Sequence, residues 1–74
     1  MDRVNLLDVV ALLQDLPEYG LKRGEVGTVV EIFDATSSRP QAFLIEFSDR
    51  NGIGYAMTTV HSEQIIPLYY REAA

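Results

Sequence analysis

Few residues in this sequence have the chemistry that catalysis or metal binding requires. The chain of 74 residues has a single histidine, His61, and no cysteine, which excludes thiol catalysis and thiolate metal sites. Glu63 is the only carboxylate close to His61 in the sequence, whereas a metal site needs several converging ligands. No arrangement of nucleophile, histidine and carboxylate stands out. We therefore interpret His61 as a solvated turn residue.

Glu31 and Glu46 are predicted to lie close together on the outer face of two neighbouring strands. Paired carboxylates catalyse proton transfer only where a cleft perturbs their pKa values. On a convex outer surface both groups stay solvated, so no acid–base pair is expected. The sequence thus predicts no catalytic residue, no metal ligand and no cofactor, in a protein that is not an enzyme.

Gly24 and Gly27 precede a run of β-branched and aromatic residues that ends at Phe33. The Gly-x-x-Gly spacing also occurs in phosphate-binding loops and in KH-type nucleic-acid clamps. A phosphate-binding loop requires Gly-Lys-Ser/Thr followed by a helix, and a KH clamp requires flanking helices. Because these glycines lead into a strand, we interpret them as a tight turn or a bulge.

The segment from Leu6 to Leu16 fits two kinds of secondary structure. Several of its apolar residues have helical spacing, whereas Val9 and Val10 favour a strand. In a strand, both faces would be apolar, as expected of a central strand covered on two sides. We favour the strand, with a short helix over residues 6–13 as the alternative. Pro17 ends the element in both cases.

Two further strands are predicted at Val26–Phe33 and Ala42–Ser48, which are rich in strand-forming residues. The segment between them, residues 34–41, is small and polar and contains Pro40, so it is predicted to be a loop. Leu21, in the long loop before Val26, is expected to cover one edge of the core.

Asn51 and Gly52 predict a tight hairpin after Ser48, because both central residues of a type I′ turn need positive φ. A two-residue turn at this point sets the register of the two strands. The predicted cross-strand pairs are Phe47 with Ala56, Ile45 with Thr58, and Phe43 with Val60. A slip by one residue would exchange the inner and outer faces.

Residues 61–64 predict a 3-10 turn. Ile65–Tyr69 predict a last strand, in which Pro67 favours an edge position or a strand start. Together these elements are typical of an all-β fold, a small five-stranded SH3-like barrel with a short 3-10 turn before the last strand. We expect one domain over residues 1–74, with its core at 6–69 and a frayed tail at 70–74. The predicted inward residues are Val30, Ile32, Phe43, Ile45, Phe47, Ala56 and Val60, completed by Val9 or Val10 and by Leu68.

The net charge of −5, from eleven acidic and six basic residues, repels phosphate backbones. No apolar stretch approaches the roughly 20 residues that span a bilayer, and no signal-peptide pattern follows Met1. We therefore expect a cytoplasmic protein with no membrane partner and no general affinity for nucleic acid.

The predicted hairpin register leaves apolar side chains on the outer face of the sheet, next to the two glutamates. The six residues of the predicted partner surface are Leu44, Tyr55, Met57, Glu31, Glu46 and, on the first loop, Tyr19. Such a surface is covered either by the N-terminal segment or the tail from Tyr69, or by a protein partner or a second copy. Its acidic rim favours a basic partner.

Four tyrosines raise the question of an aromatic groove for proline-rich peptides, as in eukaryotic SH3 domains. Those domains carry an Ala-Leu-Tyr-Asp-Tyr-like segment and a tryptophan, and this sequence has neither. An aromatic and basic surface for single-stranded nucleic acid would need more lysine and arginine. Neither function is favoured.

Several segments resemble a bacterial family of short, single-domain proteins of unknown function. They are Leu-Leu-Asp-Val-Val-Ala-Leu at 6–12, Asp-Leu-Pro-Glu-Tyr-Gly-Leu at 15–21, Gly-Glu-Val-Gly-Thr-Val-Val-Glu at 24–31, Phe-Leu-Ile-Glu-Phe at 43–47 and Gln-Ile-Ile-Pro-Leu at 64–68. The resemblance extends over roughly residues 6–69. Its most specific part is Leu-Pro-Glu-x-Gly-Leu combined with Gly-x-x-Gly-Thr-Val-Val.

The resemblance implies an SH3-like barrel and supplies no catalytic residue. Some relatives are encoded beside small toxin-like or nuclease-like genes, which implies an antitoxin-like or immunity-like binder of a neighbouring gene product. We therefore expect a non-enzymatic protein-interaction module. The alternative is a nucleic-acid-associated SH3-like barrel of the ribosome or transcription-factor type, which shares the Gly-x-x-Gly-Thr-Val pattern.

Overall fold

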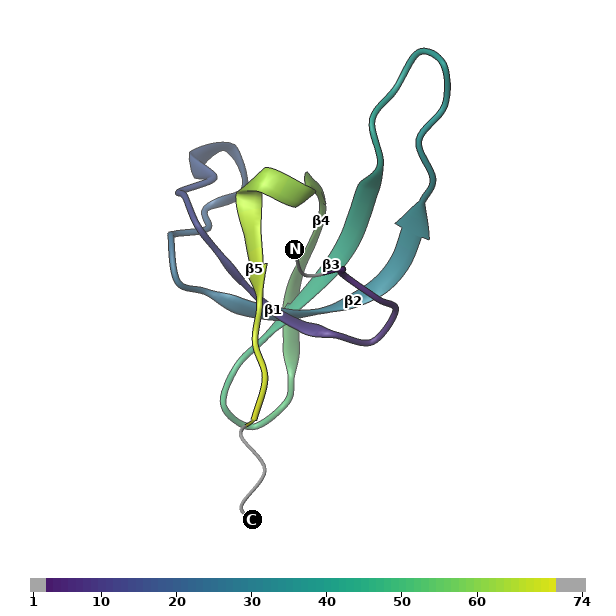
Figure 1. Ribbon diagram of the computed structural model, residues 1–74. Coiled ribbons are helices and arrows are strands. Elements are labelled where there is room, and N and C mark those ends of the chain that lie inside the picture. The colour runs from purple at the N-terminus through teal and green to yellow at the C-terminus, as the bar shows by residue number, and fades with distance from the viewer. Residues whose placement is uncertain (1–2, 71–74) are drawn as a thin grey trace.

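The computed structural model describes residues 3–70, which form one antiparallel sheet with the strand order β4-β3-β2-β1-β5 (Figure 1). The elements are β1 Val9–Leu12, η1 Pro17–Tyr19, β2 Val26–Phe33, β3 Ala42–Ser48, β4 Gly54–His61, η2 Ser62–Gln64 and β5 Ile65–Pro67, where η1 and η2 are 3-10 turns. The predicted all-β class, the five strands and the 3-10 turn before the last strand are thus confirmed. Within residues 3–70 the end strands β4 and β5 do not pair with each other, so closure into a barrel is not confirmed.

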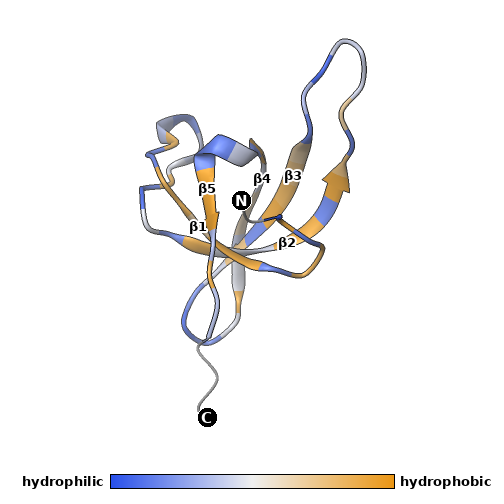
Figure 2. Ribbon diagram, viewed as in Figure 1, coloured by the Kyte–Doolittle hydropathy of each residue, from blue (hydrophilic) through white to orange (hydrophobic). Residues whose placement is uncertain are grey.

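The strand positions follow the local patterns of the sequence. β2 and β3 have the predicted bounds, and the ambiguous first segment contains the strand β1. Apolar residues run along β1, β2, β3 and β5, whereas the turns are mainly hydrophilic (Figure 2). Val10 and Leu12 are buried, but Val9 on the opposite face is 39% exposed. The expectation that β1 is covered on both faces is therefore wrong, because the core packs against only one face.

The core lies on the inner face of the curved sheet. Its buried side chains are Val10, Leu12, Leu16, Leu21, Val29, Phe43, Ile45, Phe47, Val60 and Ile65. Ile32 and Ala56 pack against this cluster while remaining partly exposed. Burial of Leu21 confirms its predicted place over one core edge. Leu21 forms an isolated antiparallel bridge with Leu16, and η1 lies in the loop between these two residues.

The prediction that Val30 points inward is wrong, because β2 contains a bulge. Val29 pairs with Ile45 and Glu31 pairs with Leu44, which leaves Val30 as the additional residue. In a regular strand Val30 would share a face with Ile32, but one extra residue exchanges the faces. Val29 is therefore fully buried instead. Its N–H donates to the carbonyl of Asp8 at 2.9 Å, so the segment before β1 bonds to the bulge.

The prediction that Leu68 completes the core is also wrong. β5 ends at Pro67, and Leu68 is 43% exposed. Ile65 pairs with Leu12 and is buried, so period-two alternation turns Leu68 toward the outer face. Of the two positions predicted from Pro67, the sheet edge is confirmed, whereas Pro67 ends β5 and does not start it. Of the predicted tail, residues 71–74 lie outside the described residues.

The turn between β3 and β4 is not the predicted two-residue type I′ turn. Gly52 has φ 80°, but Asn51 is not in the positive-φ region. The Gly52 N–H donates to the Asp49 carbonyl at 2.9 Å, and the Asp49 N–H donates to the carbonyl of Ile53 at 3.0 Å. The side chain of Asp49 organises the turn by accepting bonds from the N–H groups of Asn51 and Ile53, at 2.9 and 3.0 Å. The hairpin loop is therefore one residue longer than predicted.

A second irregularity in the hairpin restores the predicted register. Ser48 pairs with Gly54 and Phe47 pairs with Ala56, so Tyr55 is an additional residue on β4. This bulge compensates for the longer loop. The predicted pairs Phe47 with Ala56, Ile45 with Thr58 and Phe43 with Val60 are all confirmed.

Candidate functional site

The outer face of β2, β3 and β4 contains most of the predicted partner surface. Leu44 lies between Glu31 on β2 and Thr59 on β4. In the next row along the strands, Glu46 lies between Thr28 and Met57. The structure therefore brings Leu44, Met57, Glu31 and Glu46 together on one face, as the register predicted.

The apolar part of this face is accessible. Met57 is 53% and Tyr55 is 52% exposed, and Leu44 is half-buried. Within residues 3–70, neither the N-terminal segment nor the described part of the tail covers the side chains of Met57 and Tyr55. Leu68 instead bonds through its N–H to the Val9 carbonyl at 2.8 Å, which directs the chain after β5 along β1.

Tyr55 is tied to the loop before β2 through Glu25. Its hydroxyl donates to Glu25 Oε1 at 2.6 Å, and the Lys22 N–H donates to Glu25 Oε2, also at 2.6 Å. The bond from Tyr55, followed by that from Lys22, lowers the pKa of Glu25 below its ordinary value. The same bond, with smaller contributions from burial and from the charges of Glu25 and Asp49, raises the pKa of Tyr55 to about 12. The tyrosine ring is thereby held in place at the start of β4.

The carboxylate of Glu46 lies over Gly54. A methyl group at Gly54 would be 2.9 Å from Glu46 Oε2. Because glycine has no side chain, the Glu46 carboxylate can lie against the first residue of β4. The position of Glu46 on this face was predicted from the sequence, whereas its contact with Gly54 was not.

Tyr19 is not part of this face. It lies on η1, in the connection between β1 and β2, and is 55% exposed. In Figure 1 this connection lies at the upper left, while the turn between β3 and β4 lies at the bottom. Tyr19 is thus separated from the other five predicted residues.

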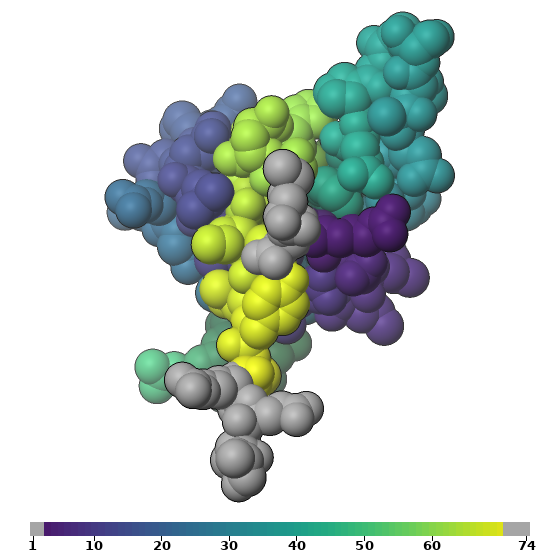
Figure 3. Space-filling model, in the orientation of Figure 1, coloured from purple at the N-terminus to yellow at the C-terminus, as the bar shows by residue number. Residues whose placement is uncertain are grey.

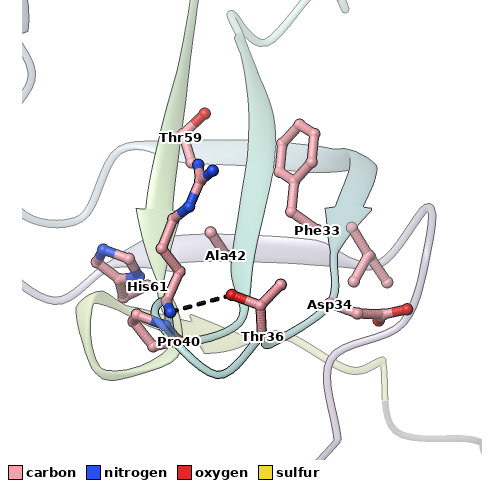
Figure 4. Close-up of a pocket in the computed structure, with 9 residues that line it drawn as sticks. Phe33, Asp34, Thr36, Pro40, Ala42, Thr59 and His61 are labelled. Atoms are coloured by element: carbon pink, nitrogen blue, oxygen red, sulfur yellow. Dashed lines mark hydrogen bonds between the residues drawn. The ribbon is translucent and has the colours of Figure 1, made fainter.

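A cleft of about 800 Å³ opens at the other end of the same outer face. Its lining residues are Ile32, Phe33, Asp34, Thr36, Arg39, Pro40, Ala42, Thr59 and His61. Phe33, Ala42 and His61 form one cross-strand row, which explains how three strands contribute to it. Figure 4 shows Ala42 between Phe33 on one side and Thr59 and His61 on the other.

The loop between β2 and β3 forms a wall of the cleft. The Thr36 N–H donates to the Arg39 carbonyl at 2.8 Å, and the Arg39 N–H donates to Thr36 Oγ1 at 3.1 Å (Figure 4). In the space-filling view this hairpin projects beyond the body of the molecule (Figure 3). The sequence predicted the loop but not the cleft, because the lining comes from segments that are far apart in the chain.

His61 takes part in the wall and in the start of η2. Its N–H donates to Gln64 Oε1 at 2.8 Å, and its ring Nδ1 lies 3.3 Å from the Gln41 carbonyl. Within residues 3–70, no group of three or more His, Cys, Asp or Glu residues is placed to hold a metal ion. Nor does the described chain contain a helix long and apolar enough to cross a membrane. His61 is exposed, but it is the last residue of β4 and not the predicted turn residue, and it also borders the cleft.

A family model described as a domain of unknown function, DUF4926, matches residues 6–67 of the chain. The chain belongs to the DUF4926 family. The matched range includes all five strands and both 3-10 turns, and therefore the outer face and the cleft. No curated protein and no solved structure shows a significant match to it. The match to the family model confirms the predicted resemblance of the DUF4926 domain to a family of unknown function.

Proposed function

We propose that this protein is a non-enzymatic module that binds a protein partner through the outer face of β2, β3 and β4. The observation that carries the proposal is the pair of half-exposed side chains Tyr55 and Met57 on β4, with the half-buried Leu44 on the same outer face. Apolar side chains gathered on an exposed face are typical of interaction surfaces, and aromatic residues and methionine are enriched in them.

The charges around these side chains favour a basic partner. β2, β3 and β4 contain no lysine or arginine, whereas Glu31 and Glu46 lie on their outer face. Complementary charge on a partner would increase the rate of association and make it dependent on salt. A second copy of the chain is a weaker candidate, because each copy has a net charge of −5.

The same charge distribution disfavours the alternative function, a nucleic-acid-associated barrel. A surface that binds phosphate backbones needs lysine or arginine, and none lies on these three strands. The strand order β4-β3-β2-β1-β5, with a 3-10 turn before β5, supports the assignment of an SH3-like barrel as the finer fold. We further propose a neighbouring gene product as the partner, in an antitoxin-like or immunity-like complex in the cytoplasm.

The partner can be captured from the host with the full chain, identified by mass spectrometry and purified for calorimetry. We expect the double variant Tyr55→Ala, Met57→Ala to weaken its binding by about tenfold or more, because both side chains lose their contact area. The matched control is Ile66→Ala, Leu68→Ala, which truncates two residues of similar exposure near β5, 45% and 43%. Unchanged affinity in a folded Tyr55 and Met57 double variant would contradict the proposal.

A further inference from the structure

The two edges of the sheet differ in how they are protected against pairing with another strand. β5 is three residues long and contains Pro67. Short edge strands and prolines are devices that prevent further pairing. β4 is eight residues long and contains no proline, lysine, arginine, aspartate or glutamate. The sheet therefore has one protected edge and one unprotected edge.

The unprotected edge is regular over most of its length. The pairing of β4 with β3 is continuous from Ala56 to His61, and the bulge is confined to Tyr55. Within residues 3–70, β4 pairs with β3 alone. Alternate N–H and C=O groups of an edge strand point away from the sheet, so this segment presents main-chain groups to an additional strand.

Two features of the outer face adjoin this edge. At its far end, Thr59 and His61 belong both to β4 and to the wall of the 800 Å³ cleft described above, which Phe33 also lines and which we call the Phe33 cleft. At its beginning, the Glu46 carboxylate lies close to Gly54, the first residue of β4. An added strand would thus pass an apolar cleft at one end and a carboxylate at the other.

We propose that the β4 edge binds an extended, basic segment of a partner protein by strand addition. Main-chain bonds to β4 would hold the segment, an apolar side chain would enter the Phe33 cleft, and a lysine or arginine would meet Glu46. In strand addition the main chain supplies affinity, and pockets for alternate side chains supply specificity. The apolar and basic residues must lie on the same face, and therefore at an even spacing along the segment.

The charge of the chain selects this occupant over a second copy. Pairing of two β4 edges would join two molecules that each have a net charge of −5. A basic segment removes that repulsion. The inference rests on the proposed function and specifies how the partner is bound.

The test uses the ¹⁵N-labelled full chain and a panel of nine-residue synthetic peptides. Each peptide has threonine at the other positions, and one Lys or Arg and one Leu, Phe or Val at an even spacing. We expect at least one member to slow amide exchange in β4 by about tenfold at saturation, with no comparable change in β5. The same peptide with alternate amides N-methylated should lose this effect, because it keeps its side chains but cannot pair.

Two variants connect the binding mode to the residues. Glu46→Lys should reduce affinity for the bound peptide by about tenfold, because attraction becomes repulsion, and Glu18→Lys on η1 is the matched control. The strand-addition proposal is overturned by failure of the whole panel, by equal binding of the N-methylated peptide, or by a dimer that protects the β4 amides of the free protein. The proposed function is judged separately: a captured partner that depends on Tyr55 and Met57 but leaves β4 amides unprotected supports it while excluding strand addition.

Discussion

The hydroxyl of Tyr55 donates a 2.6 Å hydrogen bond to Glu25 Oε1, joining the start of β4 to the loop before β2. The two residues are 30 positions apart in the chain. Glu25 also accepts the N–H of Lys22, so the bond links the β3–β4 hairpin to an ordered loop. The bond to Glu25 thus restrains the exposed side chain of Tyr55, a residue of the proposed surface, before any partner binds.

This bond predicts a change in the titration of Glu25. In Tyr55→Phe the pKa of Glu25 should rise toward its ordinary value of 4.5, because the largest cause of its lowering is removed. NMR titration of the carboxyl group measures it. Tyr19→Phe is the control, since Tyr19 is similarly exposed and lies on η1. A Glu25 pKa that stays unchanged in Tyr55→Phe would show that the bond is absent in solution.

The same pair predicts how stability depends on pH. The raised pKa of Tyr55 stabilises the folded protein below the ordinary value of 10.0, and this contribution is lost as pH rises through about 12. The lowered pKa of Glu25 stabilises the fold above 4.5, and this contribution is lost as pH falls through the lowered value. Both groups are solvent-accessible, so Tyr55→Phe should cost less than about 1 kcal/mol at pH 7. Urea denaturation at several pH values should show the difference shrinking at both extremes.

Phe47 should be among the residues most important for stability. Its side chain is fully buried, and Phe47→Ala should reduce the free energy of unfolding by roughly 3–5 kcal/mol through the cavity it leaves. Phe33→Ala is the matched control, because Phe33 is 42% exposed and has less surface to lose. Urea denaturation compares the two, and Phe47→Leu supplies a milder change if the alanine variant is unfolded. Equal losses at the two positions would contradict the observed core.

Gly27 and Gly54 should respond differently to the same substitution. A methyl group at Gly27 would lie 2.5 Å from Ile45 Cγ2 and 2.7 Å from the Glu46 carbonyl oxygen, and the backbone cannot yield easily. At Gly54 the obstacle is the end of the flexible Glu46 side chain, at 2.9 Å. Gly27→Ala should therefore cost about 1–3 kcal/mol, and Gly54→Ala less than about 1 kcal/mol. Melting temperatures that fall equally for both would argue against the close approach of β2 and β3.

Asp49 should contribute more to the β3–β4 turn than Asn51. Asp49→Ala removes two bonds from its side chain to the N–H groups of Asn51 and Ile53, which should cost about 1–2 kcal/mol. Asn51→Ala should change the free energy of unfolding by less than about 0.5 kcal/mol, because Asn51 does not have positive φ. Thermal denaturation of the two variants decides between this turn and a type I′ turn, in which Asn51 would be the more sensitive residue.

Local residue patterns were enough to predict the bounds of β2 and β3 and the register of the β3–β4 hairpin, whereas the first segment also fitted a short helix. β2 and β3 have the predicted bounds, because β-branched and aromatic residues lie between polar, glycine-containing or proline-containing segments. The register was predicted by placing Asn51 and Gly52 in a two-residue turn, which also assigned the inner and outer faces. It was correct although the turn was not, since the bulge at Tyr55 compensated for the extra loop residue.

Which valine of β2 is buried and what the outer face contains depend on contacts between distant segments of the chain. Val29 and Val30 are identical side chains, so alternation cannot distinguish them, and the bulge depends on pairing with β3 and with the segment before β1. The Phe33 cleft and the Tyr55–Glu25 bond likewise join residues that are far apart in the sequence. Such relationships depend on how strands from distant segments are placed side by side, and local periodicity holds no information about that placement.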